Sequence, residues 1–283
     1  MYQIISKETL APAIHEYEIL APKVAKKAKA GQFVILRVDE NGERIPLTIA
    51  DYNREAGTIT IVFAEAGYST KKLAKLNAGD AVQDFVGPLG VPSHVERFGK
   101  VVMVAGGVGV APVFPIARDM KAAGNHVVGI MGARNKELIF WEERMKDACH
   151  ELLVTTDDGS YVRKGFVTDV LREYIESAGK PDLVMAIGPL PMMRAVANLT
   201  KEYEIKTMVS LNSIMVDGTG MCGACRVTVG GETRFVCVDG PEFDGHLVDF
   251  EEQLMRSRKY KSEEQHALNR GGCGCGGGGK CHG

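Results

Sequence analysis

The hydrophobic pattern of this chain changes near residue 98, and that change constrains the fold more than any other feature of the sequence. Over roughly the first 95 residues, short β-type runs such as HEYEIL, QFVILRV and TITIVF are separated by turn residues, a pattern typical of a small antiparallel barrel. From Val101 onward, apolar strands such as VVMVAGG and LVMAIG alternate with helical stretches, the first of them near 111–123. This second pattern predicts a parallel sheet with helices in an α/β domain.

The two patterns and the composition divide the chain into four predicted segments. A length of 283 residues with 45% hydrophobic content suffices for about two ordinary cores and a smaller appendage. We predict a β-barrel domain over 1–97, an α/β domain over 98–209, and a small Gly- and Cys-rich unit over 210–250. Residues 251–283 should form a charged helix, extending from about 248 to 268, and a Gly- and Cys-rich tail.

Charge and hydropathy exclude several classes of partner. Lys and Arg number 34 against 36 Asp and Glu, for a formal charge of -2, so we expect no nucleic acid and no acidic lipid surface as partner. The longest uncharged run, 101–117, contains Gly and Pro and is shorter than the roughly 20 apolar residues of a membrane helix. The N-terminal residues lack the pattern of a secretory signal, so we expect a cytoplasmic protein without a membrane partner.

Cysteines gather towards the C-terminus, where six of the seven follow residue 220. In a chain without an export signal, such clustering indicates metal or redox chemistry more than disulfides. The plant-type 2Fe-2S pattern is a ligand, four residues, a Cys, two residues, a Cys and then a distant Cys, with glycines that let backbone amides approach the sulfides. The segment MVDGTGMCGACRVTVGGETRFVCVDG follows this pattern. It therefore predicts a 2Fe-2S cluster on Asp217, Cys222, Cys225 and Cys237.

Asp217 is the one departure, because it stands where the pattern has its first cysteine. A carboxylate can bind ferric iron and carries the same charge as a thiolate, so the formal charge of the site is kept. In the alternative reading Asp217 is only a turn residue, and the three cysteines need another ligand or bind zinc. Electron paramagnetic resonance of the reduced protein separates the two readings.

A glycine-rich turn over 106–112, GGVGVAP, directly follows an apolar strand and precedes a helix. Glycines permit a tight turn there, and the helix N-terminus can receive a pyrophosphate. The turn is not the G-x-G-x-x-G fingerprint, because Pro112 occupies the place of the third glycine. The second strand ends in MGARN, which supplies Arg134 where an acidic residue would bind a ribose. Arg134 can pair with a 2'-phosphate, so the choice between NAD and NADP stays open on physical grounds.

Five short motifs, in order and spacing, resemble those of ferredoxin-NADP reductase-type flavoproteins. They are RIPLT at 44–48, GYST at 67–70, GPLG at 87–90, GGVGVAP at 106–112 and GPLPMM at 188–193. With the cysteine unit, the resemblance covers roughly residues 1–250 and is nearest to small subunits of NADH-dependent reduced ferredoxin:NADP oxidoreductases, also described as sulfide dehydrogenases. Dihydroorotate dehydrogenase electron-transfer subunits resemble the chain more distantly and normally supply Cys at the position of Asp217.

This resemblance implies cofactor-binding roles for particular residues. Arg44 would clamp the FAD pyrophosphate, Thr48 would lie by the flavin N5 edge, and Ser69 and Thr70 would offer hydroxyl and backbone donors. The glycine-rich turn would face the nicotinamide nucleotide, which the resemblance predicts to be NAD(H). The full predicted cofactor set is Arg44, Pro46, Leu47, Thr48, Gly67, Ser69, Thr70, Gly106, Gly107, Gly109, Arg134, Gly188 and Pro189. No protein acid or base is expected, because hydride transfer is the cofactors' own chemistry.

The implied function is electron transfer between NAD(H), FAD and the 2Fe-2S cluster. The implied partner is a glutamate-synthase-like large flavoprotein subunit with FAD and 4Fe-4S clusters, where electrons would bifurcate between ferredoxin and NADP. Ferredoxin would thus be an indirect partner. Two alternatives stay open: support of dihydroorotate oxidation, and a nonenzymatic iron-sulfur scaffold that uses its folded units only for docking.

Several residues favour a structural interpretation. The acids of the segment 155–159 (TTDDG) are interpreted as solvated loop residues, and Cys149 as a packed small hydrophobe. We interpret His246 as a hydrogen-bonded turn residue. Cys273, Cys275, Cys281 and His282 can bind a metal, but their glycine-rich setting favours disorder.

Overall fold

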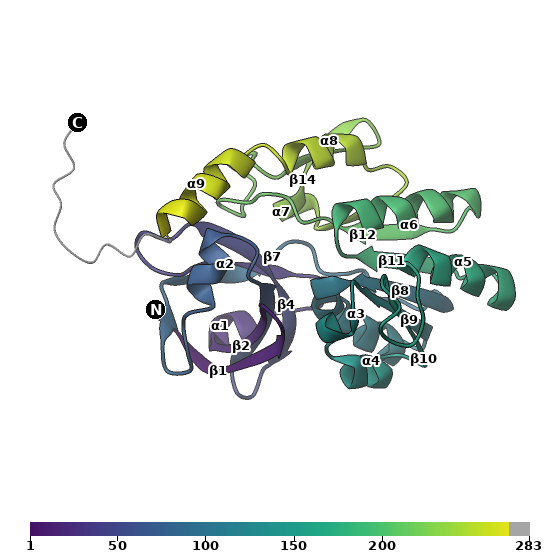
Figure 1. Cartoon of the computed structure of the whole chain (residues 1–283), viewed down its shortest axis with the longest axis horizontal. Coiled ribbons are helices and arrows are strands. Elements are labelled where there is room, and N and C mark those ends of the chain that lie inside the picture. Colours follow the sequence, from purple (N-terminus) through teal and green to yellow (C-terminus); the bar gives the residue numbers. More distant parts are fainter. Residues whose placement is uncertain (272–283) are drawn as a thin grey trace.

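A computed structural model describes residues 1–271, which form three units (Figure 1). The tail residues Cys273, Cys275, Cys281 and His282 lie outside the described residues. The first unit is a seven-stranded antiparallel sheet with strand order β6-β1-β2-β5-β4-β3-β7. Its strands are β1 (Tyr2–Ala11), β2 (Ile14–Leu20), β3 (Phe33–Arg37), β4 (Arg44–Asn53), β5 (Thr58–Ala64), β6 (Ala81–Val82) and β7 (Asp84–Leu89), with short helices α1 (Pro22–Ala25) and α2 (Tyr68–Leu73).

Alternating residues of these strands fill the barrel core. On β5, Ile59, Ile61 and Phe63 are buried, and they pack with Tyr17 of β2. The Tyr17 and Phe63 rings meet edge to face at 5.1 Å, and the Tyr17 hydroxyl donates to the carbonyls of Leu73 and Leu76 at 2.8 Å. The side chains on one face of the strand are therefore apolar, as the two-residue alternation of the sequence predicts, and the predicted barrel is confirmed.

The second unit is a parallel sheet with helices on both faces. The order is β10-β9-β8-β11-β12, and β15 (Glu242–Asp244) is added at one edge. Its strands are β8 (Lys100–Gly106), β9 (His126–Ala133), β10 (Glu151–Thr156), β11 (Leu183–Ile187) and β12 (Thr207–Ser210). The 3-10 turns η1 (Gly107–Gly109) and η2 (Lys136–Leu138) and the helices α3 (Val110–Ala122), α4 (Glu142–Ala148), α5 (Val167–Ala178) and α6 (Leu190–Glu202) connect them.

The central strands of this sheet carry continuous apolar runs because they are buried on both faces, in two separate hydrophobic cores. On β8, Val102 and Val104 pack against α5 and α6, whereas Val101 and Met103 pack against α3 and α4. A strand buried on both faces needs apolar residues at every position, which explains why VVMVAGG shows no alternation. The predicted parallel α/β domain is confirmed.

The third unit lies across the other two (Figure 1). It contains the hairpin β13 (Arg226–Val229) and β14 (Glu232–Phe235), then α7 (Val236–Asp239), β15 (Glu242–Asp244), α8 (Phe250–Arg256) and α9 (Lys261–Gly271). β15 pairs antiparallel with β12 and so extends the α/β sheet, whereas α9 contacts α2 of the barrel. The single helix expected over about 248–268 is instead two helices, separated by a turn at 257–260.

None of the helices found within residues 1–271 has the length and apolar character of a membrane span. The domain limits at residues 97, 209 and 250 remain predictions.

Candidate cofactor sites

The two predicted nucleotide-binding turns lie side by side at the carboxyl ends of β8 and β11. These strands are parallel neighbours, with Ala105 opposite Ile187. A Cβ added to Gly109 would lie 2.1 Å from the Ile187 carbonyl oxygen, and one added to Gly188 would lie 3.1 Å from Cα of Gly106. Glycine is therefore required by close backbone packing, and the packing joins both predicted turns into one edge.

Gly107 supplies the open side of this edge. Its φ of 55° lies in the left-handed region, and a Cβ there would meet nothing within 4 Å. Nucleotide sites of open α/β sheets lie at such carboxyl ends. The turn thus fits a dinucleotide, with Pro189 at the N-cap of α6 beside it.

A second group of polar residues follows β9 and β10. Arg134 is exposed, and its carbonyl accepts the Asp158 amide at 3.2 Å. Desolvation and the neighbouring Asp158 raise the pKa of Asp157, and Arg134 opposes that shift. As interpreted from the sequence, Asp157 and Asp158 are exposed, whereas Thr155 and Thr156 before them are buried. Within the part of the chain that the structure describes, the buried Oδ1 atom of Asn135 has no hydrogen-bond partner.

The predicted flavin residues of RIPLT lie on β4, where all are partly exposed. β4 pairs with β3, with Thr48 opposite Phe33 and Arg44 opposite Arg37. Sequence reasoning did not identify β4 as a strand, because Arg44, Pro46 and Asp51 interrupt its apolar pattern. Because side chains alternate along a strand, Arg44, Pro46 and Thr48 share one face of β4, whereas Leu47 packs against the barrel core.

GYST forms the start of α2, where Gly67 is the N-cap. The Thr70 hydroxyl accepts from the Gly67 amide at 3.0 Å and so caps the helix. The hydroxyl of the buried Ser69 donates to Glu43 at 3.1 Å. Both hydroxyls are therefore engaged within the protein, and the Gly67 side is open, since a Cβ there would meet nothing within 4 Å.

Arg44 joins the flavin strand to the cysteine-rich segment. Its Nε donates to the Val216 carbonyl at 2.7 Å and its Nη2 to the Asp217 carbonyl at 3.3 Å. A guanidinium has five N–H groups in a planar fork, so others remain for an anionic ligand. The predicted flavin and cluster residues are thus brought together across 172 residues of sequence.

Of the four predicted cluster ligands, two are buried, Asp217 is partly exposed and Cys222 is exposed. Cys225 and Cys237 are buried, and the Cys237 amide donates to Cys225 Sγ at 3.5 Å. Burial and the Cys225 thiol raise the pKa of Cys237 to about 12. Cys222 is exposed, and its amide donates to Asp217 Oδ2 at 2.9 Å, while the Thr219 amide donates to Oδ1 at 2.8 Å. These amides hold the pKa of Asp217 below its usual range.

The loop around these ligands has the backbone that a cluster needs. Gly218, Gly220 and Gly223 all have positive φ, a conformation that glycine adopts readily. A Cβ on Gly218 would lie 2.8 Å from Leu89 and 2.9 Å from Ile35, so the loop packs closely on the barrel. Three sulfur donors and one carboxylate form a donor set that fits a 2Fe-2S cluster. Within residues 1–271, no three His, Cys, Asp or Glu side chains converge as ligands of a single metal ion would.

One acid whose carboxyl group is buried was not identified from the sequence. The carboxyl group of Glu242, on β15, accepts a hydrogen bond from the Ser93 hydroxyl, which precedes the α/β sheet. Burial raises the pKa of Glu242 to about 7. The local sequence GPEFD does not predict this burial, because the burial comes from packing of β15 against Ser93 and Gly31 of the barrel side.

Two structural interpretations are confirmed. Cys149 is buried, at 3% exposure, and burial raises its pKa to about 12. His246 lies in a turn, with its Nε2 3.0 Å from the Thr200 hydroxyl.

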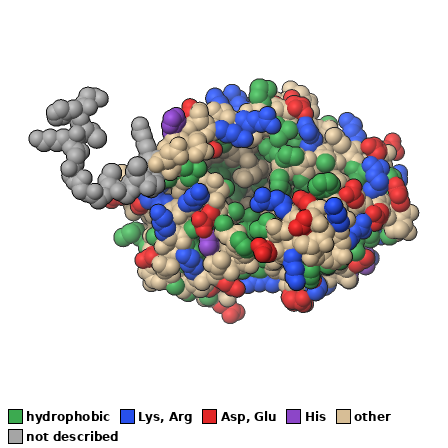
Figure 2. All heavy atoms as spheres, in the orientation of Figure 1, with side chains coloured by type: hydrophobic (Ala, Val, Ile, Leu, Met, Phe, Trp, Pro, Cys, Tyr) green, Lys and Arg blue, Asp and Glu red, His purple; other side chains and the backbone are tan. Residues whose placement is uncertain are grey.

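The edge of the sheet that carries the two glycine turns also borders the third unit. A pocket lined by Gly188 and Pro189 includes Leu254, Arg258 and Lys261 of the α8–α9 segment. Figure 2 shows that this face of the molecule is hollowed between the third unit and the other two, with hydrophobic and basic side chains around the hollow.

Comparisons with known proteins agree with this arrangement. Residues 212–249 match the iron-sulfur cluster binding domain of dihydroorotate dehydrogenase B, and 103–198 match the oxidoreductase NAD-binding domain. A Clostridium beijerinckii protein described as an uncharacterized protein in adh 3'region is 54% identical, over 97% of this chain and 99% of its own. The dihydroorotate dehydrogenase B (NAD(+)), electron transfer subunit homolog of Thermotoga maritima is 44% identical, over 95% and 94%. A chain in the solved structure of NADH-dependent reduced ferredoxin-NADP oxidoreductase has a TM-score of 0.91 and 44% identity, covering 95% and 97%.

Proposed function

The chain belongs to the family of dihydroorotate dehydrogenase B electron-transfer subunits and their homologues, and we propose on this basis that it carries electrons between NAD(H) and a partner subunit. It is an oxidoreductase subunit with FAD, a 2Fe-2S cluster and NAD(H) as cofactors. When bound, FAD exchanges a hydride with the nicotinamide and passes single electrons to or from the cluster.

The residues of the chain bind and orient these groups. We assign FAD to Arg44, Pro46, Leu47 and Thr48 of β4 and to Gly67, Ser69 and Thr70 at α2. We assign the nucleotide to Gly106, Gly107, Gly109, Arg134, Gly188 and Pro189, and the cluster to Asp217, Cys222, Cys225 and Cys237. Because hydride transfer requires close and aligned reactants, the contribution of the protein is positioning.

One observation carries this proposal: Arg44 of the flavin strand donates to the backbone of the segment that contains Asp217. The contact joins the predicted flavin and cluster residues directly. The parallel neighbours β8 and β11 bring the two nucleotide turns to one edge of the adjoining sheet. Such an order of sites suits electron transfer from nucleotide to flavin to cluster.

The proposal is tested on anaerobically purified, FAD-loaded protein. In a stopped-flow experiment, NADH should bleach the flavin absorbance. The reduced protein should then show a 2Fe-2S electron paramagnetic resonance signal. Cys225→Ser should abolish that signal and leave flavin reduction in place. A wild-type protein that binds FAD but is not reduced by NADH or NADPH would refute the proposed function.

For the partner, we propose a glutamate-synthase-like large flavoprotein subunit with FAD and 4Fe-4S clusters, and ferredoxin as an indirect partner. The support is the likeness, along 95% of this chain, to a chain of the NADH-dependent reduced ferredoxin-NADP oxidoreductase, whose structure concerns flavin-based electron bifurcation. Electron bifurcation between ferredoxin and NADP would then take place in the partner. NADH-dependent transhydrogenation should require both subunits, so full coupled activity of this chain alone would contradict the assignment.

A second candidate is the electron-transfer subunit of a dihydroorotate dehydrogenase. The match of residues 212–249 to the iron-sulfur domain of that enzyme favours it, whereas Asp217 in place of a cysteine favours the first candidate. Electron exchange with an orotate-binding partner, and no transhydrogenation, would identify the second. For either candidate we propose a cytoplasmic location.

A further inference from the structure

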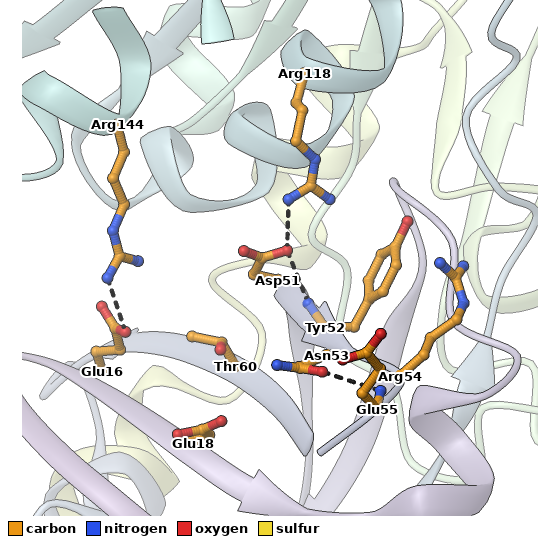
Figure 3. A pocket seen from close by; sticks show the side chains of 10 residues that line it. All are labelled: Glu16, Glu18, Asp51, Tyr52, Asn53, Arg54, Glu55, Thr60, Arg118 and Arg144. Carbon is orange, nitrogen blue, oxygen red and sulfur yellow. Dashed lines mark hydrogen bonds and ion pairs between the residues drawn. The ribbon is translucent and has the colours of Figure 1, made fainter. Parts of the chain in front are cut away.

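Two contacts join the barrel to the α/β unit on either side of a polar pocket (Figure 3). In the first, Arg118 of α3 donates from Nη1 to Asp51 Oδ1 of β4 at 2.8 Å. The Arg118 guanidinium also lies over the Tyr52 ring, 5.6 Å from its centroid. Asp51 and Arg118 are each about one-third exposed, at 29% and 37%, so the pair is only partly screened by solvent.

The second contact is made by Glu16 of β2. One carboxylate oxygen accepts the Trp141 indole N–H at 2.9 Å, and the other lies 3.4 Å from Arg144 Nη2. The Arg144 guanidinium also stacks on the Trp141 ring at 4.3 Å. Glu16 is mostly buried, at 14% exposure, which strengthens its hydrogen bonds. We call Glu16, Asp51, Arg118, Trp141 and Arg144 the interdomain clasp.

Trp141 has a strained backbone that this contact helps to hold. Its φ of 57° lies in the left-handed region, which is costly for a bulky residue and persists only where the surroundings fix it. Its ring also packs edge to face on Phe114 of α3 at 5.5 Å. Because the Arg118 guanidinium lies 5.3 Å from the centroid of the Phe114 ring, the Phe114–Trp141 pair links the two contacts of the clasp.

The Asp51–Arg118 pair of the clasp lies on β4, which carries proposed cofactor residues, and on α3, which follows others directly. β4 begins at Arg44 and reaches Asp51, and α3 directly follows the Gly107–Gly109 turn and reaches Arg118. α3 also contacts β4. Fixing Arg118 to Asp51 therefore fixes the glycine-rich turn relative to the flavin strand.

Most charged groups that line the pocket between the contacts are paired within the protein. Glu18 accepts from the Thr58 hydroxyl at 2.6 Å, and Arg54 donates to the Ala28 carbonyl at 2.9 Å and stacks on Tyr52. Figure 3 shows Arg118 and Arg144 pointing from the α/β unit to acids of the barrel. Groups already paired in this way suit a junction between units better than a site for a charged ligand.

We propose that the five clasp residues are positioning residues that set the distance and angle between the bound nicotinamide and the flavin. The proposal rests on the proposed function, because it assigns a spatial role within that hydride transfer. None of the five clasp residues is among those assigned to FAD, the nucleotide or the cluster. The clasp therefore acts on the transfer step and leaves nucleotide affinity unchanged.

The first test measures flavin reduction by NADH in the FAD-loaded protein by stopped flow. Asp51→Ala and Arg118→Met should each slow the limiting rate about tenfold, because a displacement of about 1 Å can cost about 10²-fold. The dissociation constant for NADH, obtained from the concentration dependence, should stay within about twofold. The double variant should be no slower than the slower single variant, since the two side chains act as one pair.

The second test uses Trp141, the only tryptophan of the chain, as a probe of the junction. Glu16→Ala removes both contacts of Glu16, whereas Glu16→Gln keeps an acceptor for the indole and removes the charge that faces Arg144. Acrylamide quenching of Trp141 fluorescence should rise several-fold in Glu16→Ala and change less in Glu16→Gln. The reduction rates should follow the same order.

A matched control is the ion pair Arg172–Glu202, at 3.6 Å, which joins α5 to α6 within the α/β unit. Arg172→Met and Glu202→Gln should leave both reduction rate and quenching unchanged. Wild-type reduction rates in all clasp variants would overturn the proposal, as would an equal loss in the control variants or a loss confined to NADH affinity. Absence of flavin reduction in the wild-type protein would instead contradict the proposed function.

Discussion

Replacing Glu242 with Gln should stabilise the protein at alkaline pH and change its stability little at acidic pH. The Glu242 carboxyl is buried beside Ser93, and its pKa rises from the ordinary 4.5 to about 7. The folded state therefore favours the protonated acid. Stability from this group is fully present below pH 4.5 and is lost as pH rises through about 7.

The magnitude follows from the size of the shift. Each unit of pKa difference between folded and unfolded states is worth about 1.36 kcal/mol. The shift from 4.5 to about 7 thus makes the ionised carboxylate cost on the order of 3 kcal/mol at pH 8. Glutamine has nearly the same shape, is neutral at every pH, and its amide can accept from the Ser93 hydroxyl, so it should recover about 2–3 kcal/mol at pH 8.

The assay is urea unfolding of the wild type and Glu242→Gln at pH 5 and pH 8, with the free energy of unfolding extrapolated to water. Glu204→Gln, at an exposed turn, is the matched control and should change the free energy by less than about 0.5 kcal/mol at either pH. The reasoning fails if Glu242→Gln changes the free energy equally at both values of pH, or destabilises the protein at pH 8.

Three further predictions concern the candidate sites. Asp217→Cys should retain a 2Fe-2S cluster and shift its reduction potential, because ligand type tunes potential; an unchanged potential and spectrum in a potentiometric titration would show that Asp217 is no ligand. Asp157→Ser should raise the rate of flavin reduction by NADPH relative to NADH by roughly tenfold, because one carboxylate that repels a 2'-phosphate is removed; an unchanged ratio would place the 2'-position elsewhere. Cys149, with its pKa near 12, should react with iodoacetamide at pH 8 far more slowly than the exposed Cys222 in cluster-free protein, and equal rates measured by mass spectrometry would contradict its burial.

Local patterns predicted much of the fold because they record which faces are buried. TITIVF and HEYEIL alternate, and they became neighbouring strands β5 and β2 of the barrel. VVMVAGG is apolar throughout, because β8 lies between two cores. β4 was missed, since a strand that presents Arg44 and Asp51 to other groups carries polar residues where the pattern expects apolar ones.

The candidate sites were predictable only where function imposes spacing. Cys222, Cys225 and Cys237 follow a fixed pattern, and the glycines at 106–109 follow from the turn that a phosphate needs. Glu242, by contrast, owes its raised pKa to burial against segments that are far away in the sequence, around Gly31 and Ser93. The clasp pairs Asp51 with Arg118 and Glu16 with Trp141 across the two units. Such long-range pairs leave no trace in composition or periodicity, so only the three-dimensional structure reveals them.

The antiparallel pairing of β15 with β12 gives the iron-sulfur unit a structural role that is independent of electron transfer. Without β15, β12 would be the edge of the parallel sheet, and its row of free N–H and C=O groups beside Val209 would invite pairing with another chain. A chain that lost residues 211–271 would therefore lose solubility together with its cluster. Selection against aggregation would then help to keep the unit attached, even in a descendant whose partner accepted electrons directly from the flavin.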